Sequence, residues 1–521
     1  MGENPEPLPV AFPTVVHALV DAAAKRPEQE ALALGEERLN YREYLRCVAG
    51  FSRDLRDLGL GGCRVALLMG NSIDVCIAMY AVHAARAEAV PLNPVYTVRE
   101  LLPMLDDAGV SAIVYDQALE ETVLNLADAL QIEHLLAVGS GRRLTVWRNR
   151  AGLDSLADLP EPGDPATLQF TGGTTGRAKG ARISHHSLSV NLSQREAIFP
   201  TRDDVERTLC IMPLFHCYAV SMCLHAMVYR RGALVVLPRY HPGEVLAALV
   251  SEKITVFAGS PTVFTGLLNY PGFAGADFSS LYISSSGSAP LAENVLREWE
   301  RITGTPILEG YGQSEAGPVI SFNPLHGVRK PTSVGIPLPQ TEIQVVDLET
   351  GARVLEPGQK GEIRLAGPQV MSGYRNRPEE TARTLRDGWL YTGDIGELDE
   401  DGYLYIRGRK KEMLLVSGYN VFPREIEEIL HQNPGVKEAA VVGRTDAYRG
   451  ELPVAFIVPG VENGLDEDTL RQYCTENLAP YKIPAEFHFV EHLPKTVVGK
   501  VDKIRLTEMA NREPKGLGAR G

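Results

Sequence analysis

Residues 254–261 read Ile-Thr-Val-Phe-Ala-Gly-Ser-Pro, and this pattern decides the fold class of the chain. A short apolar run leads into small polar residues, and Pro261 suits the first turn of a following helix. Similar runs recur at 234–237, 281–283 and 306–309, with helical patterns over 242–253 and 291–302. Short buried strands linked by helices predict a doubly wound parallel sheet. Ligands of such sheets bind beyond the carboxyl ends of the strands.

Segments of small residues follow these predicted strands. Residues 284–290 read Ser-Ser-Ser-Gly-Ser-Ala-Pro, and residues 310–315 read Gly-Tyr-Gly-Gln-Ser-Glu. A third segment, TGGTTGRAKG at 171–180, follows a predicted strand at 166–170. Its glycines let backbone N–H groups approach an anion, and Lys179 adds a positive charge. The spacing matches neither the P-loop nor the dinucleotide pattern, but the residue types indicate a phosphate site.

Composition narrows the class of protein. The chain has 521 residues, a net charge of −14 and seven cysteines without a C-x-x-C pair. The length predicts more than one domain, and the acidic balance argues against nucleic acid as a partner. The cysteines and the lack of a secretion signal or transmembrane segment predict a cytoplasmic protein with reduced thiols. The most apolar stretch, 210–229, is expected to be a buried strand and a core helix. A peripheral membrane contact and a homodimer are left open.

The second half of the chain changes character twice. Residues 340–410 carry short strand patterns separated by Gly, Pro and Asp, which predict a small antiparallel subdomain. After 410, a helix opening at Pro423 and apolar runs at 439–442 and 454–458 indicate a compact α+β domain. We therefore expect two domains, residues 1–410 and 411–521.

Six motifs occur in a recognisable order. The chain resembles the adenylate-forming superfamily of acyl-CoA synthetases, peptide-synthetase adenylation domains and luciferases. Together with GPQVMSGYRNRPEET (367–381), the details are most similar to bacterial fatty acyl-CoA synthetases. The resemblance implies a large N-terminal domain, with doubly wound sheets and an antiparallel subdomain, and a small mobile C-terminal domain. The motifs are FTGGTTGRAKG (170–180), SGSAPL (286–291), LEGYGQSE (308–315), YTGD (391–394), GRKKEMLLVSGYNVFPREIE (408–427) and PKTVVGK (494–500).

The resemblance implies that ATP, Mg²⁺ and coenzyme A are used. Mg²⁺ prefers hard oxygen ligands, and Glu315 and the Thr174 hydroxyl would supply them. Ala178 stands where the family usually has proline, which leaves the charge of Lys179 in place. The residues that would hold the β- and γ-phosphates are Thr171, Gly172, Gly173, Thr174, Thr175, Gly176 and Lys179.

A second group of residues is implied to hold the nucleoside. Tyr311 would stack on adenine, and Gly310 and Gly312 would leave room for the flat ring. Asp394 would accept hydrogen bonds from the ribose hydroxyls, and Arg409 would meet the ribose or the α-phosphate. The remaining residues of this group come from the SGSAPL and LEGYGQSE motifs: Ser286, Gly287, Ser288, Glu309 and Ser314.

The C-terminal motifs imply the catalytic lysine and the thioester site. Lys500 matches the lysine that family members insert for adenylation, where it would meet charge on the α-phosphate. Lys503, close by, is expected at the surface. Lys411 falls at the hinge position of a domain that rotates after adenylation. By the same resemblance, Gly418 and Tyr419 would line the pantetheine tunnel and Arg449 would meet the CoA nucleotide.

The acyl side of the site is expected to be apolar. His216 lies where family members place a gate near the acyl carboxylate, and the pocket should draw on residues 215–220, 260–264 and 312–319. Apart from Glu315, which the resemblance assigns to Mg²⁺, these segments carry no acidic residue that could pair with a substrate ammonium. We expect an ATP-dependent acid–CoA ligase that activates a medium- or long-chain fatty acid through an acyl adenylate, releasing AMP and pyrophosphate. The alternatives are an aryl or alicyclic acid–CoA ligase, an adenylating enzyme that loads a carrier protein, and a nucleotide-binding regulatory protein.

Overall fold

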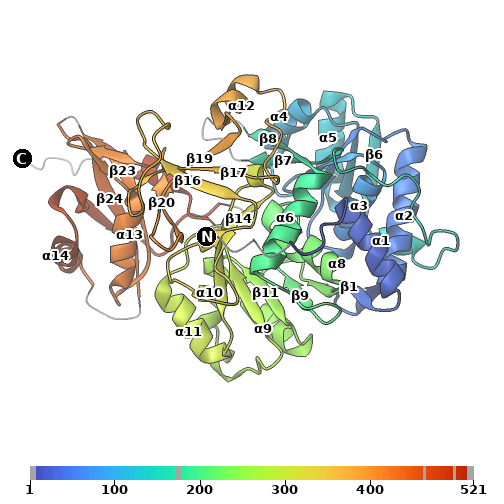
Figure 1. The fold of residues 1–521 in the computed structure, drawn as a ribbon, viewed down its shortest axis with the longest axis horizontal. Coiled ribbons are helices and arrows are strands. Elements are labelled where there is room, and N and C mark those ends of the chain that lie inside the picture. The colour runs from blue at the N-terminus through green and yellow to red at the C-terminus, as the bar shows by residue number, and fades with distance from the viewer. Residues whose placement is uncertain (1–7, 172–177, 447, 461–464, 497–499, 513–521) are drawn as a thin grey trace, which may run out of the picture. The chain divides into compact units, whose positions relative to one another are not determined.

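The computed structural model describes residues 8–171, 178–446, 448–460, 465–496 and 500–512. The chain forms two compact units (Figure 1). The first unit comprises Met1–Ile343 and Leu365–Tyr391, and the second comprises Gln344–Arg364 and Thr392–Gly521. The second unit thus contains residues 344–364 and 392–410 in addition to the expected C-terminal domain. The expected boundary at 410 between the N-terminal domain and a mobile C-terminal domain stays a prediction.

The parallel sheet expected around residues 232–312 is confirmed in the first unit. The strand order is β15-β14-β13-β12-β11-β9-β10-β1-β2. Neighbouring strands from β13 to β1 pair in parallel, and β2, β14 and β15 are antiparallel additions at the edges. The strands are β1 (Glu30–Leu34), β2 (Glu37–Asn40), β9 (Arg207–Cys210), β10 (Ala233–Val236), β11 (Val256–Gly259), β12 (Ile283–Ser286), β13 (Ile307–Gly312), β14 (Val319–Phe322) and β15 (Ile336–Pro337).

A second sheet of the first unit has the order β6-β5-β3-β4-β7-β8. The strand expected at 166–170 is its β7 (Pro165–Thr171), which pairs in parallel with β4. β8 pairs antiparallel with β7, so the glycine-rich segment connects the two strands of a hairpin. The other strands are β3 (Arg64–Leu68), β4 (Glu88–Pro91), β5 (Ala112–Asp116), β6 (His134–Val138) and β8 (Lys179–Ser184).

Helices pack on both faces of these sheets, as a doubly wound fold requires. The α-helices of the first unit are α1 (Val15–Lys25), α2 (Tyr41–Asp57), α3 (Ile73–Ala84), α4 (Val98–Ala108), α5 (Glu120–Leu130), α6 (His185–Ile198), α7 (Cys217–Ala219), α8 (Ala226–Arg230), α9 (Pro242–Ser251), α10 (Pro261–Leu268), α11 (Glu293–Thr303) and α12 (Pro378–Thr384). Ala66 and Leu68 of β3 pack with side chains of α4 and α5, whereas Val65 and Leu67 pack with those of α2 and α3. The alternation follows from the two-residue repeat of a strand.

Residues 210–229 confirm the expected buried strand and core helix. β9 ends at Cys210, and a helical run follows that contains α7, the π-helix η3 (Val220–His225) and α8. Every residue from Ala219 to Tyr229 is buried in the core of the first unit. Within the part of the chain that the structure describes, no helix is long and apolar enough to cross a membrane.

The second unit contains the expected antiparallel and α+β parts. Two further sheets have the orders β16-β17-β19-β18, with β20 on β19, and β22-β21-β24-β23, with β25 on β24. The second sheet lies wholly in the second unit, whereas β18 of the first sheet belongs to the first unit. Helix α13 opens at Pro423 and buries Ile426 and Leu430, as predicted, while Ile429 is only half-buried. The elements are β16 (Glu342–Val346), β17 (Gly361–Ala366), β18 (Leu385–Arg386), β19 (Trp389–Leu398), β20 (Leu404–Arg409), β21 (Leu414–Val416), β22 (Tyr419–Val421), α13 (Pro423–Gln432), β23 (Val436–Asp446), β24 (Gly450–Pro459), α14 (Glu467–Asn477), β25 (Glu486–Phe489) and α15 (Lys503–Ala510).

Candidate active site

The glycine-rich segment begins and ends on paired strands. Thr171, the last residue of β7, pairs with Lys179, the first residue of β8. The Thr171 hydroxyl donates to the Lys179 carbonyl oxygen at 3.5 Å. Both ends of the predicted phosphate loop are therefore fixed by the sheet. Five predicted phosphate-binding residues lie outside the described residues: Gly172, Gly173, Thr174, Thr175 and Gly176.

Glu315 lies next to these strand ends. Its Oε1 accepts a hydrogen bond from the Tyr374 hydroxyl at 2.8 Å and another from the Thr171 hydroxyl at 3.2 Å. Lys179 Nζ lies 5.1 Å from the centroid of the Tyr374 ring. Burial, followed by the charge of Glu315, raises the pKa of Tyr374, so its hydroxyl stays a donor at neutral pH. The structure thus brings together the predicted residues Thr171, Lys179 and Glu315.

The sequence motifs did not identify Tyr374 as a site residue. It belongs to the GPQVMSGYRNRPEET run, which supported the resemblance, but its position in that run assigned it no role. The backbone N–H of Met371 donates to the Glu315 carbonyl oxygen at 2.9 Å, so the segment that carries Tyr374 is also bonded to the Glu315 backbone. This contact between distant segments depends on tertiary structure.

The two motifs predicted to hold the nucleoside lie side by side in the sheet. Ser286, at the carboxyl end of β12, is in register with Glu309 of the parallel neighbour β13. Glu309 is 4% exposed, and its Oε1 accepts a hydrogen bond from the backbone N–H of Leu291 at 2.9 Å. Glu309 therefore joins the SGSAPL segment to the LEGYG segment. Ser288 adopts a left-handed conformation, with φ of 70°, directly after the strand.

The structure gives its own reason for glycine at two positions of the LEGYG segment. A Cβ added to Gly310 would overlap the Phe322 ring, and one added to Gly312 would overlap the Pro318 carbonyl oxygen. Glycine at these positions thus lets β14 and the residue before it approach closely, and the expected room for a flat ligand stays a prediction. Tyr311 lies between the two glycines in β13. Its stacking on adenine stays a prediction. Gly287 lies against the Tyr218 ring, 3.2 Å from an added Cβ.

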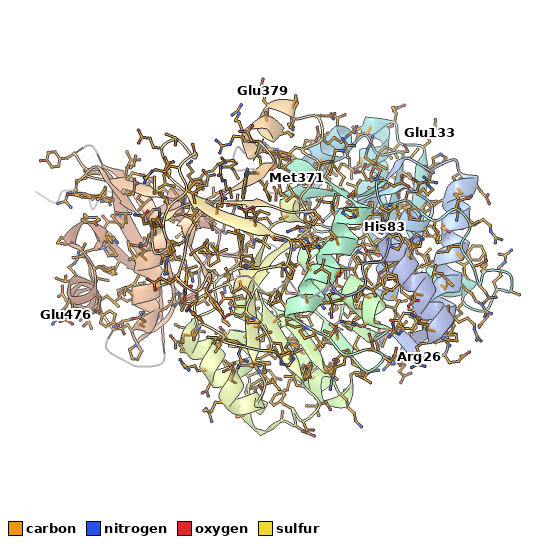
Figure 2. The ribbon with its side chains drawn as sticks, viewed as in Figure 1. Arg26, His83, Glu133, Met371, Glu379 and Glu476 are labelled. Carbon is orange, nitrogen blue, oxygen red and sulfur yellow. The ribbon has the colours of Figure 1, made fainter. Side chains whose placement is uncertain are left out.

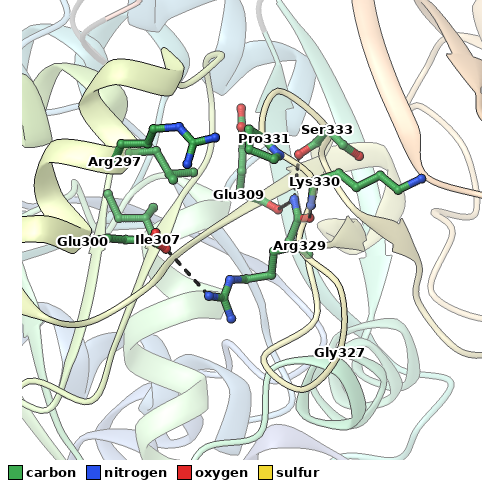
Figure 3. Close-up of a pocket in the computed structure, with 11 residues that line it drawn as sticks. Arg297, Glu300, Ile307, Glu309, Gly327, Arg329, Lys330, Pro331 and Ser333 are labelled. Carbon is green, nitrogen blue, oxygen red and sulfur yellow. Dashed lines mark hydrogen bonds and ion pairs between the residues drawn. The ribbon is translucent and has the colours of Figure 1, made fainter.

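Glu309 also lines a polar cavity of about 270 Å³ in the first unit (Figure 3). Arg297 comes from α11, and Arg329 and Lys330 come from the segment that follows β14. Arg329 Nη2 lies 3.9 Å from Oε1 of Glu300, which also lines the cavity. Both basic and acidic side chains line the cavity. It lies beside the segments that are predicted to hold the nucleoside.

His216 begins the helical run of the core. Its Nδ1 accepts a hydrogen bond from the backbone N–H of Tyr218 at 3.2 Å, which makes His216 the N-cap of α7. The next residue, Cys217, has its Sγ 3.2 Å from Oγ of Ser314. His216 therefore stands near the LEGYGQSE motif, and its role as an acyl gate stays a prediction.

A second cavity starts at Ser314 and Cys217 and is lined mainly by buried apolar side chains. Its volume is about 30 Å³, much smaller than that of the polar cavity. Two of the three segments expected to form the acyl pocket contribute to it, and residues 260–264 do not. The lining residues are Met79, Pro91, Thr167, Gln169, Ile183, Leu188, Leu192, Cys217, Val220, Ser221, His225, Ser314, Gly317 and Pro318. The contributions from α3, β4, β7, β8 and α6 required knowledge of the fold.

In the second unit, Asp394 and Arg409 face each other across the β19–β20 pair. They are directly opposite in register, and Arg409 Nε lies 3.2 Å from Asp394 Oδ1. The Asp394 side chain is 4% exposed and that of Arg409 is 51% exposed. Gly393 has φ of 70°, and the Thr392 hydroxyl accepts a hydrogen bond from the Asp394 N–H at 3.1 Å. The YTGD motif thus places a buried carboxylate beside an exposed guanidinium.

The basic run from Arg407 to Lys411 is largely matched by carboxylates. Arg407 contacts Glu397 and Glu428, and Lys410 Nζ donates to Glu362 at 2.8 Å. Arg409 pairs with Asp394, so Arg407, Arg409 and Lys410 each have a carboxylate partner within the second unit. Lys411, at the predicted hinge position, is exposed.

The predicted thioester residues gather at a tight turn. Ser417 and Gly418, with φ of 52° and 84°, connect β21 to β22 as a two-residue hairpin. Tyr419 stacks on Tyr481, with ring centroids 4.4 Å apart. The Arg449 carbonyl oxygen accepts a hydrogen bond from the Ser417 N–H at 2.7 Å. The structure therefore brings Gly418, Tyr419 and Arg449 together.

Lys500 and Lys503 differ in their surroundings. The backbone N–H of Lys500 donates to the Thr496 hydroxyl at 3.2 Å, and its carbonyl oxygen accepts from the Thr496 N–H. The expectation that Lys503 lies at the surface is wrong. Its Nζ lies 2.9 Å from Glu427 and 3.1 Å from Glu412, and its side chain is 23% exposed. Burial lowers the pKa of Lys503, but the two carboxylates outweigh it and the pKa is raised.

Comparison with known proteins identifies the family. Residues 19–375 match the model of the AMP-binding enzyme family. The chain belongs to this family. Residues 425–500 match the model of the AMP-binding enzyme C-terminal domain, which agrees with the expected order of the two domains.

Relatives of this AMP-binding enzyme match it over nearly its full length. A long-chain-fatty-acid–CoA ligase of Bacillus subtilis (strain 168) is 35% identical over 540 residues, covering 97% of this chain and 96% of the relative. The structure of ATP-bound MatB from Rhodopseudomonas palustris has a TM-score of 0.87 at 31% identity, covering 95% and 98% of the two chains. An anthranilate CoA ligase, AuaEII, in complex with anthranoyl-AMP has a TM-score of 0.89 at 27% identity, covering 97% and 98%.

These similarities confirm several expectations for the AMP-binding enzyme. The adenylate-forming superfamily, the α/β fold with a separate C-terminal domain and the class of AMP-forming acid–CoA ligase are confirmed. The use of ATP and CoA follows from the family and its neighbours. A regulatory protein without activity, one of the alternatives, is not favoured by relatives that are ligases. The roles of individual residues are not tested by these similarities.

Proposed function

We propose that this enzyme activates a medium- or long-chain fatty acid with ATP and transfers the acyl group to the thiol of free coenzyme A. The acid carboxylate attacks the α-phosphorus, the bond to pyrophosphate breaks, and an acyl adenylate forms. The CoA thiol then attacks the acyl carbon, loses its proton and displaces AMP. The observation that carries the proposal is the largely apolar lining of the cavity that includes Ser314, the neighbour of Glu315.

The first half-reaction needs stabilisation of phosphate charge. Lys179 and the glycine-rich segment, at the junction of β7 and β8, would hold the leaving pyrophosphate. Glu315 is already fixed by the hydroxyls of Tyr374 and Thr171, so it would need little reorganisation to act at the nucleotide. In this arrangement Tyr374 is a positioning residue that acts through Glu315.

Mg²⁺ would bind to the oxygens of Glu315 and Thr174, with ATP phosphates and waters completing its shell. The donor set fits, because the Glu315 carboxylate and the nearby Thr171 hydroxyl offer hard oxygen atoms. When bound, the ion supplies positive charge to the phosphates. Among the described residues, no group of three His, Cys, Asp or Glu side chains is placed to hold a metal by itself, which agrees with a metal held largely by its nucleotide.

Each residue predicted to hold the nucleoside would act in its family role. Tyr311 would stack on adenine, with residues 286–288 on the other face. Asp394 would accept from the ribose hydroxyls, and Arg409, already its partner, would reach the ribose or the α-phosphate. The exposed half of the Arg409 side chain leaves its guanidinium accessible to a phosphate.

The second unit would supply the moving residues. Lys500 would meet the α-phosphate charge during adenylation, and rotation about Lys411 would then withdraw it. The same rotation would present Gly418 and Tyr419 to pantetheine, and Arg449 to the CoA nucleotide. Support comes from the proximity of these last three residues around one exposed hairpin turn. The moving domain of this proposal is residues 411–521.

We place the enzyme in the cytoplasm, where its seven cysteines, all free thiols in the structure, would stay reduced. A peripheral membrane contact and a homodimer are further hypotheses. Vesicle sedimentation tests the first, and light scattering on the purified chain tests the second.

The proposed function is tested by separating the two half-reactions. Acid-dependent exchange of labelled pyrophosphate into ATP reports adenylation, and thioester formation with free CoA reports transfer. We expect both, with the highest kcat/KM for straight-chain acids of medium or long chain. Exchange without a CoA thioester would favour loading of a carrier protein, and a clear preference for aryl or alicyclic acids would favour the other ligase class. Absence of exchange with every acid would contradict the proposal.

A further inference from the structure

Arginine side chains gather at the C-terminal end of α4, outside the candidate active site. One of them, Arg375, belongs to the segment between Met371 and Glu379, two residues that are labelled in Figure 2. Its backbone N–H donates to a carbonyl oxygen of β8 at 2.9 Å, so this segment is bonded to the sheet. A second, Arg64, is the first residue of β3. Both belong to the first unit, and both reach Gly109, the C-cap of α4.

Each of these two arginines uses part of its guanidinium to cap the helix. Arg375 Nε donates to the Asp107 carbonyl oxygen at 2.8 Å, and Arg64 Nε donates to that of Ala108. Such bonds satisfy carbonyl groups that the last turn of a helix leaves open. Arg64 Nη1 also donates to Glu88 Oε2 at 3.5 Å. Among the described residues, Nη2 of Arg64 and both Nη atoms of Arg375 have no hydrogen-bond partner.

The two Nη2 atoms lie around one point beside Gly109. A Cβ placed on Gly109 would lie 3.4 Å from Nη2 of Arg375 and 3.8 Å from Nη2 of Arg64. Gly109 has no side chain and is exposed, so solvent reaches this point. A small tetrahedral anion placed there could accept hydrogen bonds from both guanidiniums at once. Arginine is the residue that binds phosphate oxygens most specifically, because its planar fork matches their spacing.

The charges around this point also favour an anion. Two more cations belong to the same cluster: Arg182, which is exposed on β8, and Arg377, whose Nη2 lies 4.0 Å from Asp107 Oδ1. Burial lowers the pKa of Arg375, and the charges of Arg64 and Arg182 lower it further, against the opposite effect of two carboxylates. Four arginines thus stand against two carboxylates, and the cluster has an excess of positive charge.

We propose that this cluster is a binding site for a phosphate dianion, which the guanidiniums of Arg64 and Arg375 hold beside Gly109. A phosphate monoester carries a charge of about −1.5 to −2 at neutral pH, which balances the excess positive charge of the cluster. A free phosphate and the headgroup of phosphatidate offer the same chemistry. The inference goes beyond the proposed ligase function and does not depend on it, because none of these residues has a role in that reaction.

The test is a calorimetric titration of the full chain with inorganic phosphate at constant ionic strength. It is made on Lys179→Ala as well as on wild type, because the glycine-rich segment is itself a predicted phosphate site. We expect saturable binding that Lys179→Ala retains. In that background, Arg64→Gln and Arg375→Gln should each weaken the binding about tenfold or more, since each removes charged donors. Arg99→Gln, which changes an exposed arginine at the other end of α4, is the matched control and should leave the affinity unchanged.

A further variant keeps every arginine in place. Gly109→Asp puts a carboxylate of the chain where the phosphate would bind, and aspartate tolerates the left-handed conformation of this residue, with φ of 57°, better than most side chains do. It should lose phosphate binding even if Arg375→Gln does not fold. Sedimentation with phosphatidate vesicles, compared with phosphatidylcholine vesicles, then distinguishes the two sources. Vesicle binding that Gly109→Asp abolishes would assign the lipid headgroup, and soluble binding alone would assign free phosphate.

Two results would overturn the inference. The first is the absence of saturable phosphate binding in Lys179→Ala, which would leave the glycine-rich segment as the source of any binding by wild type. The second is binding that both Arg375→Gln and Gly109→Asp leave unchanged. Neither result bears on the ligase function, which pyrophosphate exchange tests separately.

Discussion

Side-chain hydrogen bonds hold two candidate carboxylates of the first unit, whereas the structure shows backbone hydrogen bonds at Lys500 and Arg449 in the second unit. In the first unit, Glu315 accepts from two hydroxyls and Glu309 from a backbone N–H, each with its carboxylate. In the second unit, the N–H groups of Lys500 and Arg449 donate to Thr496 and Asp446. Both kinds of contact fix a position, but they fix different atoms.

This difference in hydrogen bonding agrees with the roles proposed for these residues. A carboxylate whose oxygens are already bonded is preorganised, and it acts without a large cost of reorientation. A lysine carries its charge on a flexible four-carbon stem, so its charged end can enter a site and later leave it while the backbone keeps its bonds. Glu309 and Glu315 are thus suited to keep their positions throughout the reaction, and Lys500 to act in one step of it.

The largest expected effect separates the two half-reactions. Lys500→Ala should lower the adenylation rate by about 10²–10³, the usual cost of removing one preorganised donor. Thioester formation from supplied acyl adenylate and CoA should stay near the wild-type rate. Lys495→Ala is the control, because this lysine lies in the same motif and pairs with Glu438 at 2.9 Å. Equal loss of both half-reactions would refute the role given to Lys500.

The next effect concerns a cation of the second unit that is held by its charged end. Lys503→Met leaves Glu427 without its closest cation, and we expect a loss of about 2–3 kcal/mol in unfolding free energy near neutral pH. Burial raises the pKa of Glu427, but Lys503 outweighs it and the pKa is lowered. The wild-type advantage should therefore be full above the ordinary carboxyl pKa and fade as the pH falls through the lowered one.

The stabilising effect of the same ion pair should also be lost at high pH. Because the pKa of Lys503 is raised, its contribution is full below the ordinary lysine value and is lost as the pH rises through the raised one. Urea unfolding of wild type and Lys503→Met should differ most between about pH 5 and about pH 10. Lys25→Met, which removes an exposed pair with Asp21, should unfold like wild type at every pH. A difference that does not change with pH would contradict this account.

A smaller effect tests the preorganisation of Glu315. Tyr374→Phe removes the hydroxyl that donates to Glu315, and we expect about a tenfold loss in the adenylation rate. The KM for CoA in the transfer step should stay unchanged. Tyr405→Phe is the matched control, because it removes a hydroxyl that donates to Asp399 at 3.2 Å in the second unit. Wild-type exchange by Tyr374→Phe would show that Glu315 needs no such positioning.

The smallest effect concerns Arg449, which is exposed. Arg449→Ala should raise the KM for CoA about threefold, because exposed charge pairs contribute little. Pyrophosphate exchange, which does not involve CoA, should be unaffected. The KM effect should shrink with added salt, which screens exposed charges. An unchanged KM at low salt would remove Arg449 from the CoA site.

Local pattern predicted much of the fold. The strands β10 to β13, the helices that open at Pro242, Pro261 and Pro423, and the strand before the glycine-rich segment each have an apolar run or a proline of their own. The pairing of β7 with the antiparallel β8 was not predictable in the same way. This pairing depends on which strand lies alongside β7, and residues 179–184 do not by themselves indicate their partner strand.

The sequence by itself determined the motifs, their order and the chemistry that those residue types allow, because a phosphate loop or a ribose carboxylate is local in the chain. Tertiary structure alone decided which side chains surround them. Tyr374 reaches Glu315 from 59 residues away, and side chains of α3, β7 and α6 line one cavity together with Ser314. Lys503, which its sequence placed at the surface, lies between two carboxylates. Each contact joins segments distant in sequence, and only folding brings them within hydrogen-bonding distance.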